Sequence, residues 1–257
     1  MTNSRHYFST SLEKGLKILS LFNGETSVLT QSEISRVLGL NVTSTYRYIN
    51  TFVHLGYLEK DPKTKELRPG FRSLTLCSNL IRATDHLQLV KNYVDSIYKK
   101  YNITIDVGLT VDDTMMRVYH KEAEETLTYN LPDVAKNCLH NTSVGKAFLS
   151  TLTADELEQV LDRIDLRAKT IHTICEKEAL MAEIEKTRAQ GYAMCIEEYL
   201  PGLITIGAPL INPSTKKGIG AVSFDFSVLQ NSAEEIKEKY RDLIKDTAAA
   251  LSERLHR

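Results

Sequence analysis

Cysteine is scarce and scattered in this chain of 257 residues. The four cysteines lie far apart and form no CxxC pair, so their spacing predicts reduced thiols and no metal site. Long apolar runs are also missing, and no stretch of roughly 18 hydrophobic residues could form a membrane span. The N-terminal MTNSRHYFST contains no apolar segment typical of a secretory signal. These absences favour a cytoplasmic protein.

Motifs of common enzyme classes are missing as well. Ser143–Lys146 has the glycine and lysine of a phosphate-binding loop, but that motif needs glycine in place of His140 and a hydroxyl residue in place of Ala147. Gly218-Ile219-Gly220 lies between a turn and a strand, where a dinucleotide fingerprint would need a strand and then a helix. HExxH and GxSxG do not occur.

The composition is that of a globular protein with enough apolar residues for a sizeable core. It is 42% hydrophobic and 25% charged, and the length suits one large or two ordinary domains. Residues 1–80 hold ten Lys and Arg against six Asp and Glu, a net charge of +4. The remainder holds 22 against 27, a net charge of −5. A mildly basic module joined to an acidic body suits a nucleic-acid-binding protein, although so small an excess also arises by chance.

The first predicted helix is SLEKGLKILSLF, residues 11–22. Leu12, Leu16 and Leu19 recur at spacings of four and three, so we expect them to form its buried face. Asn23-Gly24 should end this helix, with Gly24 as a left-handed cap.

A second helix is predicted to begin at Thr30, because Thr30–Glu33 has the form of a capping box. Ile34, Val37 and Leu38 should form its buried stripe. Gly39 permits the sharp turn that must follow.

The third predicted helix, capped by Asn41, has one apolar and one polar side. The apolar side carries Val42, Tyr46, Ile49 and Val53. The polar side carries Thr43, Ser44, Arg47, Tyr48 and Thr51. Two helices joined by a tight turn form a helix-turn-helix, whose second helix enters the major groove of DNA. Hydroxyls and arginine can bond phosphates or base edges there, and an ordinary solvated helix face is the alternative.

A basic hairpin follows the three helices. Residues 57–60 and 66–68 are predicted strands, and the loop between them contains Pro62 and two lysines. Three helices and such a hairpin are typical of a winged helix, whose wing lysines lie along phosphates. The residues predicted to contact DNA are Thr43, Ser44, Thr45, Tyr46, Arg47, Lys63 and Lys65.

The rest of the chain alternates helices and strands after a helical linker. The linker carries Leu74 and Leu80, which suit either a dimer contact or packing on its own body. Strands are predicted at 103–111, 115–120, 127–131, 191–198, 203–211 and 219–226. Helices are predicted at 89–101, 143–151, 153–164 and 176–190, and from about Ser232 onward. This order predicts an α+β body with a mostly antiparallel sheet.

Three segments resemble the IclR family of bacterial transcription regulators: SLEKGLKIL, SEISRVLGLNVTSTYRYI and GYLEKDPKTKELRPG. The resemblance extends from about Ser11 to the last helix, and one departure, Pro69-Gly70 in place of Leu-Gly, lies outside the reading helix. It implies a winged helix-turn-helix domain at 1–70, a linker helix at 71–88 and a GAF-like effector-binding domain at 89–257. It also implies homodimers or homotetramers.

The resemblance further implies an effector pocket. The amides of Ser143 and Val144 would bind a carboxylate, as free N–H groups at a helix start can. The matched positions on the C-terminal strands are Cys195, Thr205, Ser223 and Asp225. Cys195 replaces a carboxylate and Asp225 a small hydroxyl residue, so we expect Asp225 to be a charged acceptor for the far end of the ligand. Simple helix capping at Thr142 or Ser143, and a purely structural Asp225, are the alternatives.

Together these patterns predict a transcription regulator whose affinity for operator DNA changes with a small carboxylate-containing metabolite. The expected partners are pseudo-palindromic double-stranded DNA, the effector and a second copy of the chain, with no cofactor and no membrane. One alternative is a methyltransferase-like enzyme with a winged-helix dimerisation domain, but the glycine-rich first turn it needs is missing after residue 88. The other is a ligand-binding or scaffold protein that does not touch DNA.

Overall fold

The computed structural model describes residues 8–23, 26–83, 85–111, 114–124, 134–136 and 138–256. The chain divides into two compact units, residues 1–84 and 85–257, each with its own hydrophobic core. Among the described helices, none is both long enough and apolar enough to cross a membrane.

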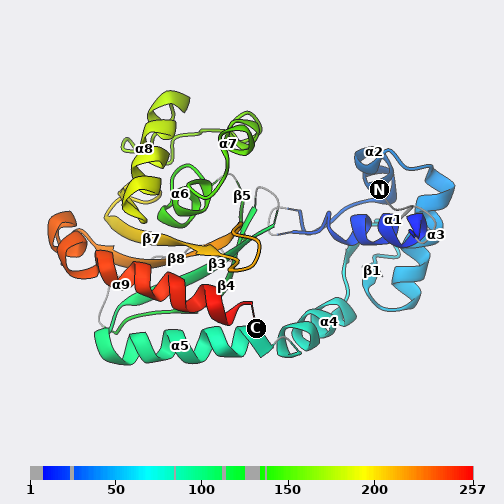
Figure 1. The fold of residues 1–257 in the computed structure, drawn as a ribbon. Coiled ribbons are helices and arrows are strands. Elements are labelled where there is room, and N and C mark those ends of the chain that lie inside the picture. Colours follow the sequence, from blue (N-terminus) through cyan, green and yellow to red (C-terminus); the bar gives the residue numbers. More distant parts are fainter. Residues whose placement is uncertain are drawn as a thin grey trace. The chain divides into compact units, whose positions relative to one another are not determined.

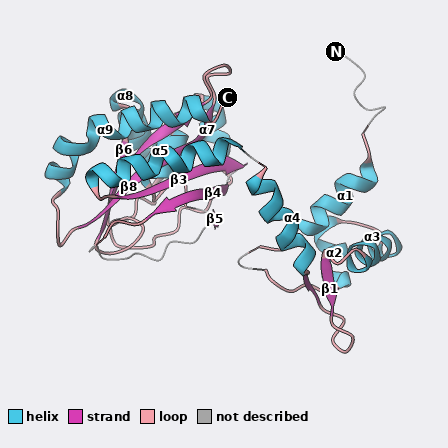
Figure 2. Cartoon of the chain, turned by 90° about the horizontal axis from the view of Figure 1, so that it is seen from below, coloured by secondary structure: helices cyan, strands magenta, loops and turns pink. Residues whose placement is uncertain are grey.

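The first unit contains a helix-turn-helix, a two-stranded wing and a following helix (Figures 1 and 2). Its elements are α1 (Thr10–Leu19), α2 (Gln31–Leu38), α3 (Val42–His54), β1 (Leu58–Lys60), β2 (Leu67–Pro69) and α4 (Phe71–Arg82). The wing strands pair antiparallel, with Glu59 opposite Arg68. The predicted winged-helix order is therefore confirmed.

Two local signals set the turn between α2 and α3. The Thr30 hydroxyl accepts a hydrogen bond from the Glu33 amide, and the Thr30 amide donates to the Glu33 carboxylate at 2.7 Å. Gly39 ends α2 with φ 61°, in the left-handed region that favours glycine. Both features are as predicted, because each depends on a few neighbouring residues only.

The predicted buried faces of the first unit are partly wrong. Its core consists of Ile18, Ile34, Ile49, Leu58 and Leu67. Leu12 and Leu16 of α1, Val37 of α2, and Val42 and Tyr46 of α3 are all exposed. These helices carry apolar residues on more than one side, and periodicity alone does not tell which side the neighbouring helices cover. The α1 helix also ends at Leu19, before the predicted cap at Gly24, which lies outside the described residues.

The second unit is a six-stranded sheet with helices on both faces. Its helices are α5 (Asp85–Tyr101), α6 (Ser143–Leu149), α7 (Ala154–Leu161), α8 (Lys177–Gln190) and α9 (Ala233–Arg254). Its strands are β3 (Thr104–Val111), β4 (Thr114–Lys121), β5 (Val134–Lys136), β6 (Ala193–Ile196), β7 (Leu203–Ile211) and β8 (Gly218–Ser227). The strand order is β5-β4-β3-β8-β7-β6, and every pair is antiparallel. The predicted α+β class is confirmed.

The sheet of the second unit has two different faces. Figure 1 shows α5 and α9 on one face and α6, α7 and α8 on the other. Ile105, Val222 and Phe224 point toward α5 and α9 in the main core. The alternate residues of the same strands, among them Asp106 and Ser223, therefore point toward α6. The strand predicted at 127–131 lies outside the described residues, and β5 was not predicted.

Candidate nucleic-acid interface and ligand cavity

The start of α3 is fixed by its cap. The side-chain oxygen of Asn41 accepts a hydrogen bond from the Thr43 amide at 2.9 Å. The Thr45 hydroxyl donates to the Asn41 carbonyl at 3.0 Å, and Thr45 is fully buried. Thr45 therefore faces the core of the unit, and its assignment as a DNA contact is wrong.

The outer face of α3 carries polar groups that are available to a partner. Thr43, Tyr46 and Arg47 are exposed and Ser44 is half-buried. The Lys60 amine lies 5.9 Å from the centre of the Tyr46 ring, which brings the wing next to this face. Val42, which the sequence placed on the buried side, is 59% exposed beside them. An apolar side chain there could contact a thymine methyl group.

The wing loop holds its two lysines differently. The Asp61 carboxylate accepts hydrogen bonds from the backbone amides of Thr64 and Lys63 at 2.9 and 2.7 Å, which lowers the pKa of Asp61. The Lys65 amine donates to the Pro62 carbonyl at 2.6 Å. Lys63 makes no such bond within the described chain and extends into solvent.

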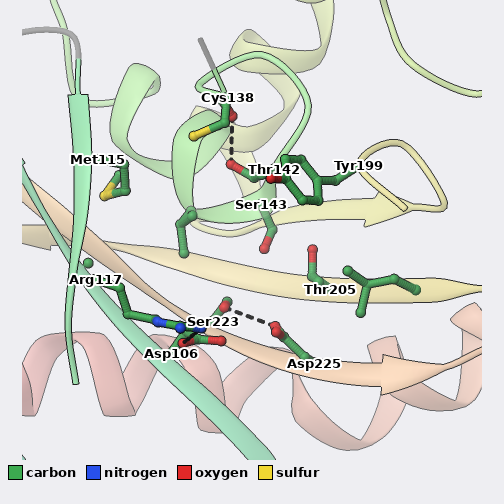
Figure 3. A pocket seen from close by; sticks show the side chains of 13 residues that line it. Asp106, Met115, Arg117, Cys138, Thr142, Ser143, Tyr199, Thr205, Ser223 and Asp225 are labelled. Atoms are coloured by element: carbon green, nitrogen blue, oxygen red, sulfur yellow. Dashed lines mark hydrogen bonds and ion pairs between the residues drawn. The ribbon is translucent and has the colours of Figure 1, made fainter. Parts of the chain in front are cut away.

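A cavity lies in the second unit between α6 and the sheet (Figure 3). It contains about 620 Å³ of space not filled by protein atoms, open solvent at its mouth included. The predicted effector residues that line it are Ser143, Val144, Thr205, Ser223 and Asp225. Lining residues that the sequence did not single out include Asp106, Arg117, Met115, Cys138 and Tyr199.

The start of α6 forms one end of this cavity. The Thr142 hydroxyl caps the helix by accepting from the Gly145 amide at 3.1 Å, and it donates to the Cys138 carbonyl. The amides of Ser143 and Val144 have no acceptor within the described chain. Thr142 therefore caps the helix, and the amides of Ser143 and Val144 still have no acceptor within the described chain. Gly145 is required here, because a Cβ atom would lie 2.4 Å from the backbone of Leu139.

Two hydroxyl groups stand beside those amides. Figure 3 shows the side chains of Ser143 and Thr205 directed into the cavity from α6 and β7. Thr205 is only 8% exposed, and its hydroxyl has no hydrogen-bond partner among the described residues. A buried hydroxyl without a partner is costly, so this one is available to a ligand.

Two carboxyl groups and an arginine form the opposite wall. An Asp106 oxygen lies 2.9 Å from Nδ1 of His120 and 3.4 Å from the Arg117 guanidinium. The Ser223 hydroxyl donates to Asp225 at 3.0 Å. Burial, followed by the nearby charge of Asp106, raises the pKa of Asp225 well above its usual range. This shift favours the neutral form of Asp225 over the charged acceptor that the sequence suggested.

Cys195 does not line the cavity but lies behind α6 beside a buried ion pair. The amine of Lys146, fully buried, is 2.5 Å from the Glu198 carboxylate. Burial raises the pKa of the Cys195 thiol, so the thiol is neutral next to this pair. Glu198 belongs to the loop that carries Tyr199 to the cavity. The ion pair therefore joins that loop to the helix whose first amides face the cavity.

Comparison with known families covers both units. Residues 79–253 match the family model described as bacterial transcriptional regulator IclR C-terminal. Residues 11–62 match the IclR helix-turn-helix domain. The chain belongs to the IclR family. It is accordingly a DNA-binding transcription regulator and not an enzyme, which confirms the resemblance seen in the sequence.

Curated relatives agree with this membership. The HTH-type transcriptional regulator XynR of Escherichia coli is 26% identical over 254 residues, covering 95% of this chain and 96% of that protein. The Pca regulon regulatory protein of Pseudomonas putida is 26% identical and covers 92% and 81%.

Two solved structures share the fold. An IclR regulator from Silicibacter sp. TM1040 gives a TM-score of 0.80 at 20% identity, with 96% of each chain covered. An IclR homologue from Microbacterium hydrocarbonoxydans, solved in complex with 4-hydroxybenzoate, gives 0.69 at 19% identity, with 96% and 99% covered.

Proposed function

We propose that this regulator binds operator DNA through α3 and the wing, and that a small carboxylate metabolite in the α6 cavity changes its affinity for that DNA. One observation carries the second half of the proposal. The amides of Ser143 and Val144 and the hydroxyl of Thr205 have no hydrogen-bond partner within the described residues, and all three residues line the same cavity. Three unused hydrogen-bonding groups in one enclosed space favour an anionic ligand.

On DNA, α3 lies in the major groove. Thr43, Ser44, Tyr46 and Arg47 contact bases or nearby phosphates, while the wing lysines Lys63 and Lys65 contact phosphates. The exposure of these side chains supports this docking face. Because Lys65 is bonded to its own loop, Lys63 is the stronger phosphate contact of the two.

The regulator binds as a homodimer or a pair of dimers. One module of this size covers only a half-site, so the operator is a pseudo-palindrome. Exposed apolar side chains on two helices support self-association, namely Leu12 and Leu16 of α1 and Phe71 and Leu74 of α4. Sedimentation tests this part. A monomer at micromolar concentration that retains full operator affinity would contradict it.

The effector carries its carboxylate to the α6 amides and a polar group to the opposite wall. The 4-hydroxybenzoate complex of the Microbacterium homologue supports an acid with a second polar end. Hydroxy acids, amino acids and hydroxylated aromatic acids therefore rank above plain dicarboxylates, and the regulator meets them in the cytoplasm.

Selection of bound fragments from the source genome by the purified protein tests the proposal. We expect enrichment of a few promoter fragments that share a pseudo-palindrome, and a change in their retention when a metabolite mixture is added. If no promoter is enriched with or without metabolites, the proposed function is wrong.

A further inference from the structure

Two carboxyl groups lie on the same face of neighbouring strands in the cavity. In the β3–β8 register Asp106 is opposite Ser223, and Asp225 is two residues further along β8. Residues two apart on a strand share a face, so the two aspartates are diagonal neighbours. Asp106 is 6% exposed and Asp225 is 9% exposed, and both line the cavity (Figure 3).

Among the described residues, the ion pairs of these two aspartates are all made by Asp106. Arg117 and His120, both on β4, face Asp106 at 3.4 and 2.9 Å. Asp225 instead receives the neutral hydroxyl of Ser223. Two neighbouring buried carboxylates repel each other, and the one that forms no ion pair within the described residues is the one that takes up a proton.

We infer that Asp106 and Asp225 hold one proton between them, and that this pair selects an effector whose far end is a hydroxyl group rather than an ammonium group or a second carboxylate. The inference rests on the proposed function, because it assigns the ligand class of the same cavity.

A hydroxyl group fits because it both donates and accepts. One Asp106 oxygen is buried and has no partner among the described residues apart from the proton shared with Asp225, so a ligand hydroxyl that inserts between the two groups can donate to it. Protonated Asp225 supplies a donor beside it. A ligand carboxylate can only accept, and it would be repelled by Asp106. An ammonium group cannot accept from Asp225, and its positive charge favours the ionised form of Asp225, so its binding releases the proton. A methyl group would leave the Asp106 oxygen unsatisfied.

The first test compares acids that differ only at the far end. Calorimetry should be run with 4-hydroxybutyrate, 4-aminobutyrate, succinate and butyrate, and with 4-hydroxybenzoate against benzoate. We expect the hydroxy acid to bind about ten- to a hundredfold more tightly than its partners, the worth of one hydrogen bond to a charged group. Two buffers with different ionisation enthalpies count the protons. Binding of the hydroxy acid should release no proton, and binding of the amino acid should release about one.

The second test uses variants of the pair. Asp225→Ala should lose the preference for the hydroxy acid, and Asp225→Asn, which keeps a neutral donor of the same shape, should restore it. Wild-type affinity should fall as pH rises through the pKa of Asp225, whereas the affinity of Asp225→Asn should not. Asp106→Asn should reduce the discrimination against succinate. Asp242→Asn on α9, whose side chain is 70% exposed, is the matched control and should change none of these.

A third test needs no ligand. Infrared spectra of the free regulator near pH 7 should contain the band of a protonated carboxyl, and Asp225→Asn should lack it. A raised pKa in the folded state contributes stability at low pH that is lost as pH rises through that pKa. The unfolding free energy of the wild type should therefore fall more steeply than that of Asp225→Asn as pH rises from the ordinary pKa of an aspartate towards the raised pKa of Asp225.

The inference is overturned if the infrared band is missing, if the amino acid or succinate binds most tightly, or if Asp225→Asn fails to restore the preference. It is also overturned if no acid of the panel binds. The proposed function is judged separately by the genome-fragment selection with metabolite mixtures. If the regulator binds promoter fragments and responds to a metabolite of another class, the inferred ligand class is wrong and the proposed function is still supported.

Discussion

The first unit has its functional groups on the surface, and the second has them in a cavity. Arg47 on α3 is exposed, and its side chain has no hydrogen-bond partner among the described residues. In the effector unit the groups point inward between the sheet and α6, where each must be paired, protonated or kept for a ligand. Polar and charged side chains therefore cost little stability in the first unit and much more in the second. Mutations should reveal this difference as effects on DNA binding in one unit and on stability in the other.

Lys146→Met should have the largest effect. It leaves the carboxylate of Glu198 buried and unpaired, because Lys146 is fully buried and 2.5 Å from Glu198. Loss of one partner of a buried pair costs about 3–5 kcal/mol of unfolding free energy. Urea unfolding monitored by circular dichroism measures it.

A second ion pair provides the matched control. Lys177 and Asp162 are also 2.5 Å apart, but both side chains are partly exposed. Lys177→Met should cost far less unfolding free energy, because solvent screens the exposed pair. The double variant Lys146→Met/Glu198→Leu should recover much of the loss, since replacing both partners removes the unpaired charge. If Lys146→Met and Lys177→Met lose the same unfolding free energy, burial does not determine how much each ion pair contributes to stability.

Arg47→Ala should come next, and its effect should appear in DNA binding. If Arg47 bonds a guanine, its loss costs about 1–3 kcal/mol of operator binding and relaxes specificity at that position. The free energy of unfolding should change by no more than about 0.5 kcal/mol, because the side chain is exposed. Quantitative mobility shifts against operator and scrambled DNA test this. Arg241→Ala on α9 is the control, and a wild-type result for Arg47→Ala would show that the docking face is wrong.

The sequence predicted the first unit well wherever the signal was local. The Thr30 capping box, the turn at Gly39 and the wing strands depend on a few adjacent residues. The faces of the helices depend on which neighbours pack against them. Leu12 and Leu16 are exposed although their spacing resembles a buried stripe, and Thr45 is buried although it is polar.

The cavity was less predictable because its wall comes from the second face of a sheet. Apolar side chains alternate along residues 103–111, a pattern typical of a strand with one buried face. Helices cover both faces, so Asp106 is buried and meets Arg117 from the next strand. A charged residue in an otherwise apolar strand was a usable signal, but its partner could be found only from the strand register.

Lys63→Ala should weaken binding to every DNA sequence by a similar factor. A lysine that contacts a phosphate contributes through released counterions, so the slope of log affinity against log salt should flatten by about one. The ratio of operator to non-specific affinity should stay the same. Titrations at several salt concentrations measure both quantities. A variant that changes this ratio would place Lys63 at a base, contrary to the proposed wing contact.

Thr205→Val should have the smallest effect. It should increase stability and decrease affinity for the effector. The Thr205 hydroxyl is buried without a partner, so its removal should raise the unfolding free energy by about 1 kcal/mol or less. Affinity for the effector should fall, because the same hydroxyl serves the ligand. Thr247 on α9 is the matched control, since it too is buried with an unpartnered hydroxyl but is not among the residues lining the cavity. Thr247→Val should stabilise the regulator similarly and leave effector binding unchanged. If both variants behave alike in calorimetry, the Thr205 hydroxyl is a packing feature and does not contact the ligand.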